Sequence, residues 1–410
     1  MPIKLVFTLF VPVSCLLLAT AAYADNAKSE PATFAEALVG GDAAVKLRYR
    51  FEIVDDDAFD ERAEASTLRT SLSYRTADWR GWSLFLEAEN VAAVFDDDDY
   101  NNAGAGSLNN GVRGVPVVAD PKLTEINQAS LRFRGEWLTA TVGRQAVNLG
   151  DQRFVGAVAW RQNHQTFDAA RFQLKASDRT SLDYTFVRGV HRIFGDEVDL
   201  EGHLLNAPFK FGDGHQLTAY GYWLDYDDAI TNSTATYGLE YKGKHEVSDR
   251  WTLAWELEAA QQDDYGDNPR EVDTDYLSAS FGGDSGLFGF DVTWEVLGGR
   301  GDGQRSFQTP LATLHKWNGW ADKFLVTPSP GLETLYLRLK SKPAPAWKLM
   351  VIYHEFTSND GDIDYGTEID AEVVYTSPWK QAFALKFADY EADRFSRDTQ
   401  KLMLWSSYAF

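Results

Sequence analysis

The stretch AAVKLRYRFEI, from Ala43 to Ile53, alternates apolar and charged side chains with a period of two. Its apolar members are Val45, Leu47, Tyr49, Phe51 and Ile53, and its charged members are Lys46, Arg48, Arg50 and Glu52. Because successive side chains of a strand point to opposite faces, the stretch predicts a β-strand with one apolar and one charged face. Such a strand suits a wall that separates hydrocarbon from water.

The same period recurs along the chain in about 18 segments, each near the ~10 residues with which a tilted strand crosses a bilayer. Short turns such as ADWRG and FGDGH alternate with longer, often acidic connections. A sheet in hydrocarbon must close, because an unpaired edge there cannot be hydrated. The sequence therefore predicts an all-β fold: a single closed antiparallel transmembrane β-barrel of about 18 strands, with short periplasmic turns and long extracellular loops.

The N-terminus predicts export. Lys4 is followed by a long apolar run that ends in Ala22, Tyr23 and Ala24, which is the pattern of a secretory signal peptide. A membrane anchor is the alternative, and Pro12 and the small residues at the end of the run favour cleavage. We predict a signal peptide at residues 1–24, a periplasmic N-terminal extension at 25–42 and the barrel at 43–410. Cleavage removes Cys15, the single cysteine, so the exported chain has no disulfide.

Composition excludes some partners. The 61 acidic residues outnumber the 39 basic ones, which argues against nucleic acid as a partner because phosphate contacts require a basic patch. Aromatic residues make up 14% of the chain, as expected for girdles at both membrane interfaces. The segment KLMLWSSYAF ends in Phe410, and many outer-membrane barrels end in Phe. We predict the bacterial outer membrane as the location, with lipid, lipopolysaccharide and the barrel assembly machinery as partners.

Three stretches carry a family resemblance: Val142–Gly156, Ala159–Phe172 and Leu314–Leu339. They resemble the alginate-export porin family of bacterial outer membranes. The resemblance implies an 18-stranded barrel that passes anionic polyuronate through a basic lumen, and hence a passive channel for anionic or polar saccharides. A general or nutrient-specific porin for small solutes is the alternative within transport. An outer-membrane hydrolase and a non-conducting structural barrel are alternatives of another class.

Charged side chains on the strands should face the lumen, because a charge on the lipid face costs about 2–4 kcal/mol at the bilayer midplane. We expect these cations to line the channel and attract an anionic solute. The alternative is that they are hydrated and balanced by nearby carboxylates. The candidate strand residues are Arg48, Arg50, Arg132, Arg134, Arg171 and Arg338.

The connection at residues 146–165 and its flanks hold a second group of candidates. Arg144, Arg153 and Arg161 stand among amide side chains, and arginine offers a planar fork for carboxylates. We expect this loop to fold inward and form the constriction. The alternative is that the arginines clamp the loop to the wall through Asp151 and Asp168. Lys316 and Lys323, with two nearby tryptophans, form a further candidate cluster for a sugar acid.

No catalytic motif stands out, and the sequence predicts neither an enzyme nor a cofactor. The acidic runs at residues 55–57, 96–99, 225–228 and 263–264 are expected in the outer loops. They are candidates for Ca2+ that bridges lipopolysaccharide phosphates, although the runs lack the ligand spacing of an EF-hand. Solvated loop charge is the favoured interpretation of these runs.

Overall fold

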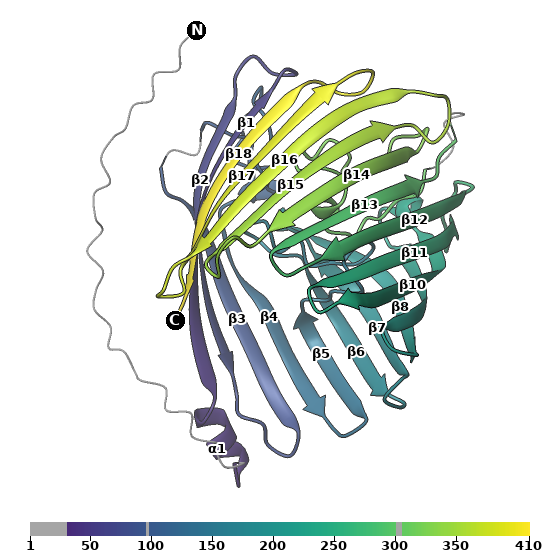
Figure 1. The fold of residues 1–410 in the computed structure, drawn as a ribbon. Coiled ribbons are helices and arrows are strands. Elements are labelled where there is room, and N and C mark those ends of the chain that lie inside the picture. The colour runs from purple at the N-terminus through teal and green to yellow at the C-terminus, as the bar shows by residue number, and fades with distance from the viewer. Residues whose placement is uncertain (1–30, 96–97, 301–305) are drawn as a thin grey trace.

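The computed structural model describes residues 31–95, 98–300 and 306–410, and it folds them into one closed barrel (Figure 1). The predicted signal peptide lies outside the described residues. The strands are β1 (Asp42–Asp56), β2 (Ala63–Arg75), β3 (Trp82–Ala93), β4 (Leu123–Arg134), β5 (Leu138–Gln145), β6 (Thr166–Lys175), β7 (Ser181–His191), β8 (Glu197–Phe211), β9 (His215–Tyr226), β10 (Thr234–Ser248), β11 (Trp251–Asp264), β12 (Asp273–Asp284), β13 (Phe288–Leu297), β14 (Leu332–Ser341), β15 (Trp347–Thr357), β16 (Asp364–Thr376), β17 (Ala382–Ala392) and β18 (Thr399–Ala409).

All 18 strands form one antiparallel sheet in which each strand pairs with its sequence neighbours. The sheet closes because β18 pairs with β1, from Lys46 opposite Ala409 to Asp56 opposite Thr399. The N–H of Phe410 donates to the carbonyl of Val45 at 2.9 Å and continues this seam. The predicted barrel and its strand number are confirmed. The described residues contain no helix that is long and apolar enough to span a membrane.

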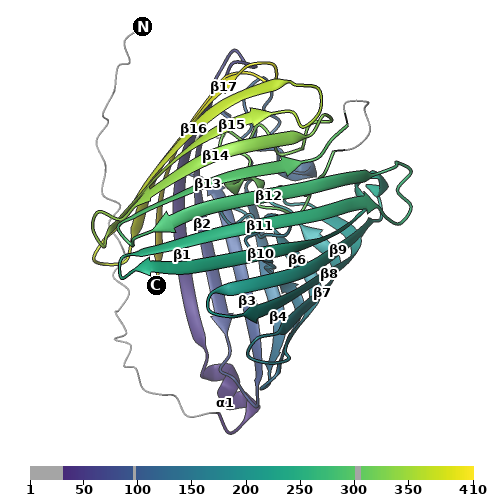
Figure 2. The same ribbon diagram turned by 45° about the vertical axis from the view of Figure 1, so that its right-hand side comes forward.

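The connections alternate in length, as the sequence predicted. Those at the periplasmic end are short, such as residues 135–137 and 212–214, whereas residues 94–122 and 298–331 form long connections at the other end. The acidic run near residue 55 begins inside β1 and leaves a short connection at 57–62, because the strand extends further than expected. The single α-helix among the described residues, α1 (Phe34–Val39), lies at the periplasmic end (Figures 1 and 2).

The outer face of the barrel is apolar. Exposed leucines and valines alternate along the strands with lumen residues, as on β14, where Leu335, Leu337 and Leu339 face outward. Aromatic residues lie at the periplasmic ends of several strands, including Trp82, Trp251, Phe288 and Trp347. Near the extracellular end, Tyr237 donates to Asp263 at 2.7 Å and Trp294 donates to Glu333 at 2.7 Å. These are the amphipathic belts expected at the two membrane interfaces.

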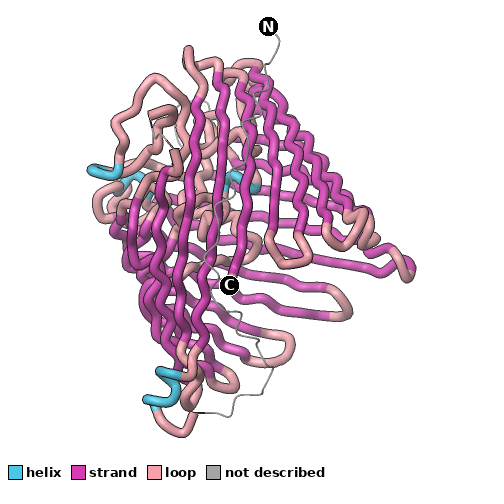
Figure 3. Tube along the Cα trace, turned by 90° about the vertical axis from the view of Figure 1, so that its left-hand side faces the viewer, coloured by secondary structure: helices cyan, strands magenta, loops and turns pink. Residues whose placement is uncertain are grey.

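Two long connections fill the barrel interior. Residues 146–165, between β5 and β6, are called L3 here, and residues 298–331, between β13 and β14, are called L7. Figure 3 shows that strands are the main regular element of the described chain, with the longer loops gathered toward one end. The main apolar cluster lies where L3 and L7 meet the wall, and it includes Val147, Phe167, Phe307, Phe324 and Phe356. Loop packing therefore supplies the core that a hollow barrel lacks.

Candidate functional site

L3 enters the lumen because β5 is only eight residues long and leaves the wall at Gln145. Arg48 and Arg50 on β1 face inward and bind the backbone of this loop. Arg48 donates to the carbonyl of Ala159 at 2.9 Å and also to the carbonyl of Arg161. Arg50 donates to the carbonyl of Trp160 at 2.7 Å. Two of the predicted lumen cations thus position the loop that narrows the channel.

A buried network of ion pairs fixes L3 to this wall. Arg161 contacts Glu52 at 3.0 Å, Asp120 at 3.7 Å and Asp322 of L7 at 3.7 Å. Glu52 is fully buried and also accepts from Arg50 at 2.6 Å. The three carboxylates hold the pKa of Arg161 above its ordinary value against the opposing effect of burial. Buried charges persist only when they are paired in this way.

An aromatic stack joins L3 to L7. The ring of Trp160 lies 3.4 Å from the ring of His315 with an interplanar angle of 10°. Lys386 on β17 contacts His315 Nε2 at 2.7 Å, and its ammonium lies 3.5 Å from the centroid of Trp320. Burial, with Lys386 adding to its effect, holds the pKa of His315 well below its ordinary value, so the ring is neutral. The contact closes the space between the two loops.

The turn of L7 next to this stack is seated on β16. Glu368 is fully buried and accepts from the N–H of Ala321 at 2.8 Å. Gly319 has a φ of +83°, and a Cβ there would lie 2.4 Å from Glu368 Oε2. Only glycine fits this close approach in a left-handed conformation.

The other end of L3 is fixed to the opposite wall. Arg153 is 1% exposed and makes a bidentate ion pair with Glu295 on β13, at 2.8 and 2.9 Å. Tyr276 donates to the same carboxylate at 2.8 Å. The position of L3 across the lumen therefore rests on ion pairs at both ends, and the loop both narrows the channel and is clamped to the wall.

Cavities lie on both sides of the L3–L7 contact. A cavity of about 480 Å³ opens toward the extracellular end and includes Asp56, Lys323 and Lys401. Two cavities of about 580 and 540 Å³ lie toward the periplasmic end and share Asp151 and Lys242. Four carboxylates and three cations line the larger of these: Asp151, Asp183, Glu240 and Glu258 against Arg171, Lys175 and Lys242. Five cations and four carboxylates line the smaller: Lys242, Lys244, Lys316, Arg338 and Lys340 against Asp151, Glu256, Asp284 and Asp291. The lumen is thus divided into chambers of different charge.

Two predicted strand residues, Arg171 and Arg338, line these chambers. Arg338 lies 3.5 Å from Asp291, and Arg171 pairs with Asp183 at 2.5 Å. Arg132 and Arg134 share the lumen face near the periplasmic end of β4, and no carboxylate of the described residues lies within 4 Å of either guanidinium. The predicted loop cluster is divided: Lys316 donates to the carbonyl of Asp151 at 2.7 Å in a periplasmic chamber, whereas Lys323 pairs with Asp56 at 2.6 Å in the extracellular one.

Arg144 lies elsewhere than predicted. It pairs with Ala129 and Asp168 in the sheet, and it shares a face with Val142, which is 53% exposed on the lipid side. Its guanidinium binds both oxygens of Asp168, at 3.0 and 3.1 Å. Arg144 therefore lies on the outer face at the extracellular end of β5, where a charge costs about 0–1 kcal/mol. It does not line the lumen.

Several lumen residues were not singled out from the sequence. They are Arg69 on β2, Lys386 on β17 and Lys401 on β18, which donates to Asp322 at 2.7 Å. All three occupy polar positions of strands with the same period of two. The alternation therefore contained the signal, but nothing in it ranked one inward charge above another.

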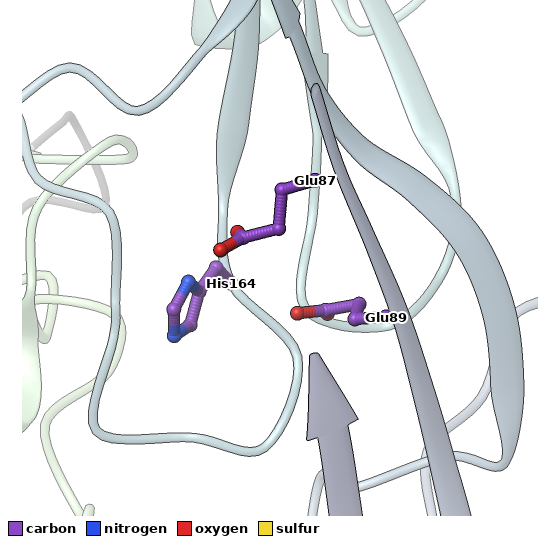
Figure 4. Close-up of side chains that lie close together, drawn as sticks. All are labelled: Glu87, Glu89 and His164. Atoms are coloured by element: carbon purple, nitrogen blue, oxygen red, sulfur yellow. The ribbon is translucent and has the colours of Figure 1, made fainter. Parts of the chain in front are cut away.

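Glu87 and Glu89 on β3 approach His164 of L3, and Figure 4 shows the three side chains directed toward a common space. Arg69 contacts both Glu89, at 2.8 Å, and the imidazole of His164. Burial and the neighbouring Arg69 hold the pKa of His164 well below its ordinary value. A neutral histidine and two carboxylates are a donor set that can hold a metal ion.

A family model described as alginate export matches residues 41–376. No curated protein matches the chain. Among solved structures, OccK9 (OpdG) of Pseudomonas aeruginosa is similar with a TM-score of 0.73 and 14% identity, covering 91% of this chain and 99% of that one. OccAB4 of Acinetobacter baumannii has a TM-score of 0.69 and 12% identity, covering 90% and 98%. OpdK of P. aeruginosa, solved with vanillate, has a TM-score of 0.68 and 17% identity, covering 90% and 98%.

Proposed function

The chain belongs to the alginate export family of the bacterial outer membrane, and from this premise we propose that it is a passive channel for anionic saccharides, with uronate oligomers as the leading class. The family membership and the barrel support an outer-membrane porin channel. We infer the class of solute from the charged and aromatic side chains that line the lumen. Flow through such a channel follows the concentration gradient of the solute.

One observation carries the choice of an anionic sugar. The chain has a net charge of −22, yet the periplasmic chamber of about 540 Å³ gathers five cations from β10, β14 and L7 against four carboxylates. Lys316 lies 4.5 Å from the centroid of Trp317, so a cation and an aromatic face stand side by side in this chamber. Its volume is within the range of small-ligand pockets. A sugar acid presents a carboxylate to the cation and an apolar ring face to the indole.

A nutrient-specific porin for smaller anions is the second candidate. The contact between Trp160 and His315 lies between the chambers, and its neighbours Arg161 and Asp322 are paired with Glu52 and Lys401. Such a barrier favours solutes smaller than a polymer unless L3 and L7 move apart. Both candidates require an anion-selective lumen, and they differ in whether a chain of sugars can enter.

Single-channel recording in a planar bilayer tests the proposal. We expect a reversal potential biased toward anions under a salt gradient, and block by oligouronates but not by neutral oligosaccharides. The double variant Lys316→Gln, Arg338→Gln should weaken that block at least tenfold, because both charges line the chamber. Lys380→Gln, in the periplasmic turn at 377–381, is the matched control and should leave the block intact. Equal block by charged and neutral sugars contradicts the saccharide proposal and leaves the porin.

A further inference from the structure

Three groups of carboxylates or histidines in the described residues bring ligand atoms within 4.8 Å of one another. In the first, Asp151, Glu240 and Glu256 surround Lys242, whose ammonium lies 2.6 Å from Glu240 and 3.4 Å from Glu256. All three carboxylates therefore share the ammonium of Lys242, and none of their buried oxygens lacks a hydrogen-bond partner.

The second group is Asp168, His191 and Glu197, on the outer face of the barrel. Arg144 binds both oxygens of Asp168, and His191 Nε2 lies 3.0 Å from one of them. Each oxygen of Asp168 thus has a partner within the chain, and this group is explained as an ion-pair cluster.

The third group, Glu87, Glu89 and His164, differs in having an unused ligand atom (Figure 4). Glu89 is 1% exposed, and its Oε2 contacts Asn127 at 2.9 Å and Arg69 at 2.8 Å. Its Oε1 is buried and has no hydrogen-bond partner. A buried carboxylate oxygen without a partner is costly, so this atom points to a ligand that satisfies it.

The contact between His164 and Arg69 leads to the same conclusion. Two N–H groups of Arg69 are directed at the two ring nitrogens of His164. A neutral imidazole accepts at one nitrogen only and carries a proton on the other. In one of the two contacts an N–H of Arg69 therefore faces the N–H of the imidazole, which is unfavourable. If a metal ion bound the imidazole lone pair instead, Arg69 would be left to pair with Glu89 alone.

We propose that Glu87, Glu89 and His164 bind one divalent transition-metal ion, with Zn2+ as the representative. The ion takes Glu89 Oε1, one oxygen of Glu87 and one nitrogen of His164, while Arg69 keeps Glu89 Oε2. Imidazole with carboxylates suits zinc and its neighbours, whereas Ca2+ and Mg2+ prefer oxygen alone.

The local charge is compatible with a cation. The carboxyl groups of Glu87, Glu89 and the nearby Glu125 face two cations, Arg69 and Lys46, and Lys46 lies 3.9 Å from Glu87. Arg48, the next cation, is directed away to the backbone carbonyls of L3. The carboxyl groups of the cluster can therefore offset the charge of a bound ion.

The bound ion would join the wall to L3. Glu87 and Glu89 belong to β3, and His164 follows Gln162 and Asn163, which bind Thr67 and the backbone of Arg192. A metal bond at His164 would hold this end of L3 in the lumen. The site then acts as a metal-dependent tie on the loop that narrows the channel.

Isothermal titration of the detergent-solubilised, tag-free barrel with ZnCl2 tests the site itself. We expect one Zn2+ per chain, with affinity at least tenfold weaker in His164→Gln and in Glu89→Gln. His164→Gln changes a loop residue and leaves the wall intact, so it covers the case in which Glu89→Gln does not fold. The matched control is His191→Gln, in the second carboxylate–histidine group, and it should bind Zn2+ as the wild type does.

Absence of Zn2+ binding, unchanged affinity in His164→Gln, or loss in His191→Gln alone would each overturn the proposal. Single-channel recording adds a functional readout that rests on the proposed channel activity. We expect Zn2+ to reduce open-channel current fluctuations in the wild type and in His191→Gln, but not in His164→Gln. Titration that succeeds in a protein without conductance would support the site and contradict the channel, so the two failures are distinguishable.

Discussion

The two walls of the lumen use the same chemical groups in different surroundings. Where L3 meets the wall formed by β1 and β18, the side chains of Arg161, Glu52 and Lys401 are at most 5% exposed. On the wall formed by β10 and β11, Lys242 is 35% exposed and Glu256 is 26% exposed. Charge interactions strengthen as water is excluded, so the first wall holds L3 and L7 in place, whereas the second can respond to solutes.

The comparison teaches that an inward charge is not by itself a binding group. The cations at the first wall already pair with carboxylates and loop carbonyls of the same chain. Those of the periplasmic chamber keep part of their surface in contact with the lumen. Solute recognition is therefore expected at the half-exposed cations, and loop position at the buried ones.

The largest effect is expected for Glu52→Gln. The change leaves the buried guanidiniums of Arg50 and Arg161 without their shared carboxylate, and breaking a buried pair costs about 3–5 kcal/mol. We expect L3 to detach, with larger current fluctuations and lower resistance to urea unfolding in liposomes. Glu256→Gln on the second wall is the matched control and should cost less than about 1 kcal/mol. Equal effects of both changes would remove the distinction between the walls.

Acidification should loosen the contact between L3 and L7. The pKa of His315 is held well below its ordinary value, so the unfolded or detached loop binds the proton more readily than the packed one. The neutral ring's contribution is present above pH about 6.5 and is lost as the pH falls toward the lowered pKa. We expect current fluctuations to rise as the pH falls below about 6.5.

The variant His315→Gln isolates this effect, because it keeps a polar group but cannot gain a proton. Asp322 contacts His315 at 2.8 Å, and its own pKa is lowered by Lys401 and His315 against the effect of burial. The contribution of Asp322 is therefore present above about pH 4 and is lost only at lower pH. A pH response that persists unchanged in His315→Gln would assign the effect to another group.

A smaller effect on stability, but a clear one on selectivity, is expected for Lys242→Gln. The change leaves Asp151, Glu240 and Glu256 without the ammonium that they share. We expect the reversal potential under a salt gradient to shift toward cations, while urea resistance changes by less than about 1 kcal/mol. An unchanged reversal potential would show that this chamber does not control ion flow.

The smallest effect is expected for Arg144→Gln. This residue lies on the outer face at the extracellular end of β5, away from the lumen. We expect the reversal potential and solute block to stay as in the wild type, whereas Arg161→Gln should change both. A shift in selectivity with Arg144→Gln would place its charge in the permeation path after all.

The error over Arg144 shows where sequence reasoning stopped short. Val142 and Arg144 are two residues apart, so they share a face of β5, and that face is the lipid side. Arg144 was assigned to the loop, and therefore to the lumen, whereas β5 continues to Gln145. Strand ends are where a charged residue on the apolar face is tolerated, because the membrane interface lies there. The end of β5 could not be located from the alternation alone.

The sequence by itself determined the barrel. A period of two, repeated in segments long enough to cross a bilayer, has no other stable arrangement in hydrocarbon than a closed sheet. It also determined which faces are polar, since alternation assigns each strand residue to one side. Arg48, Arg50 and Arg338 could be placed inward for that reason.

Only the tertiary structure decided which inward charges pair with one another. Glu52 and Arg161 are more than a hundred residues apart in the chain, and Arg153 and Glu295 are further apart still. Their pairing depends on how two irregular loops fold back into the lumen. Periodicity carries no information about loop paths, so the chambers, the L3–L7 contact and the carboxylate–histidine cluster emerged only once the chain was folded.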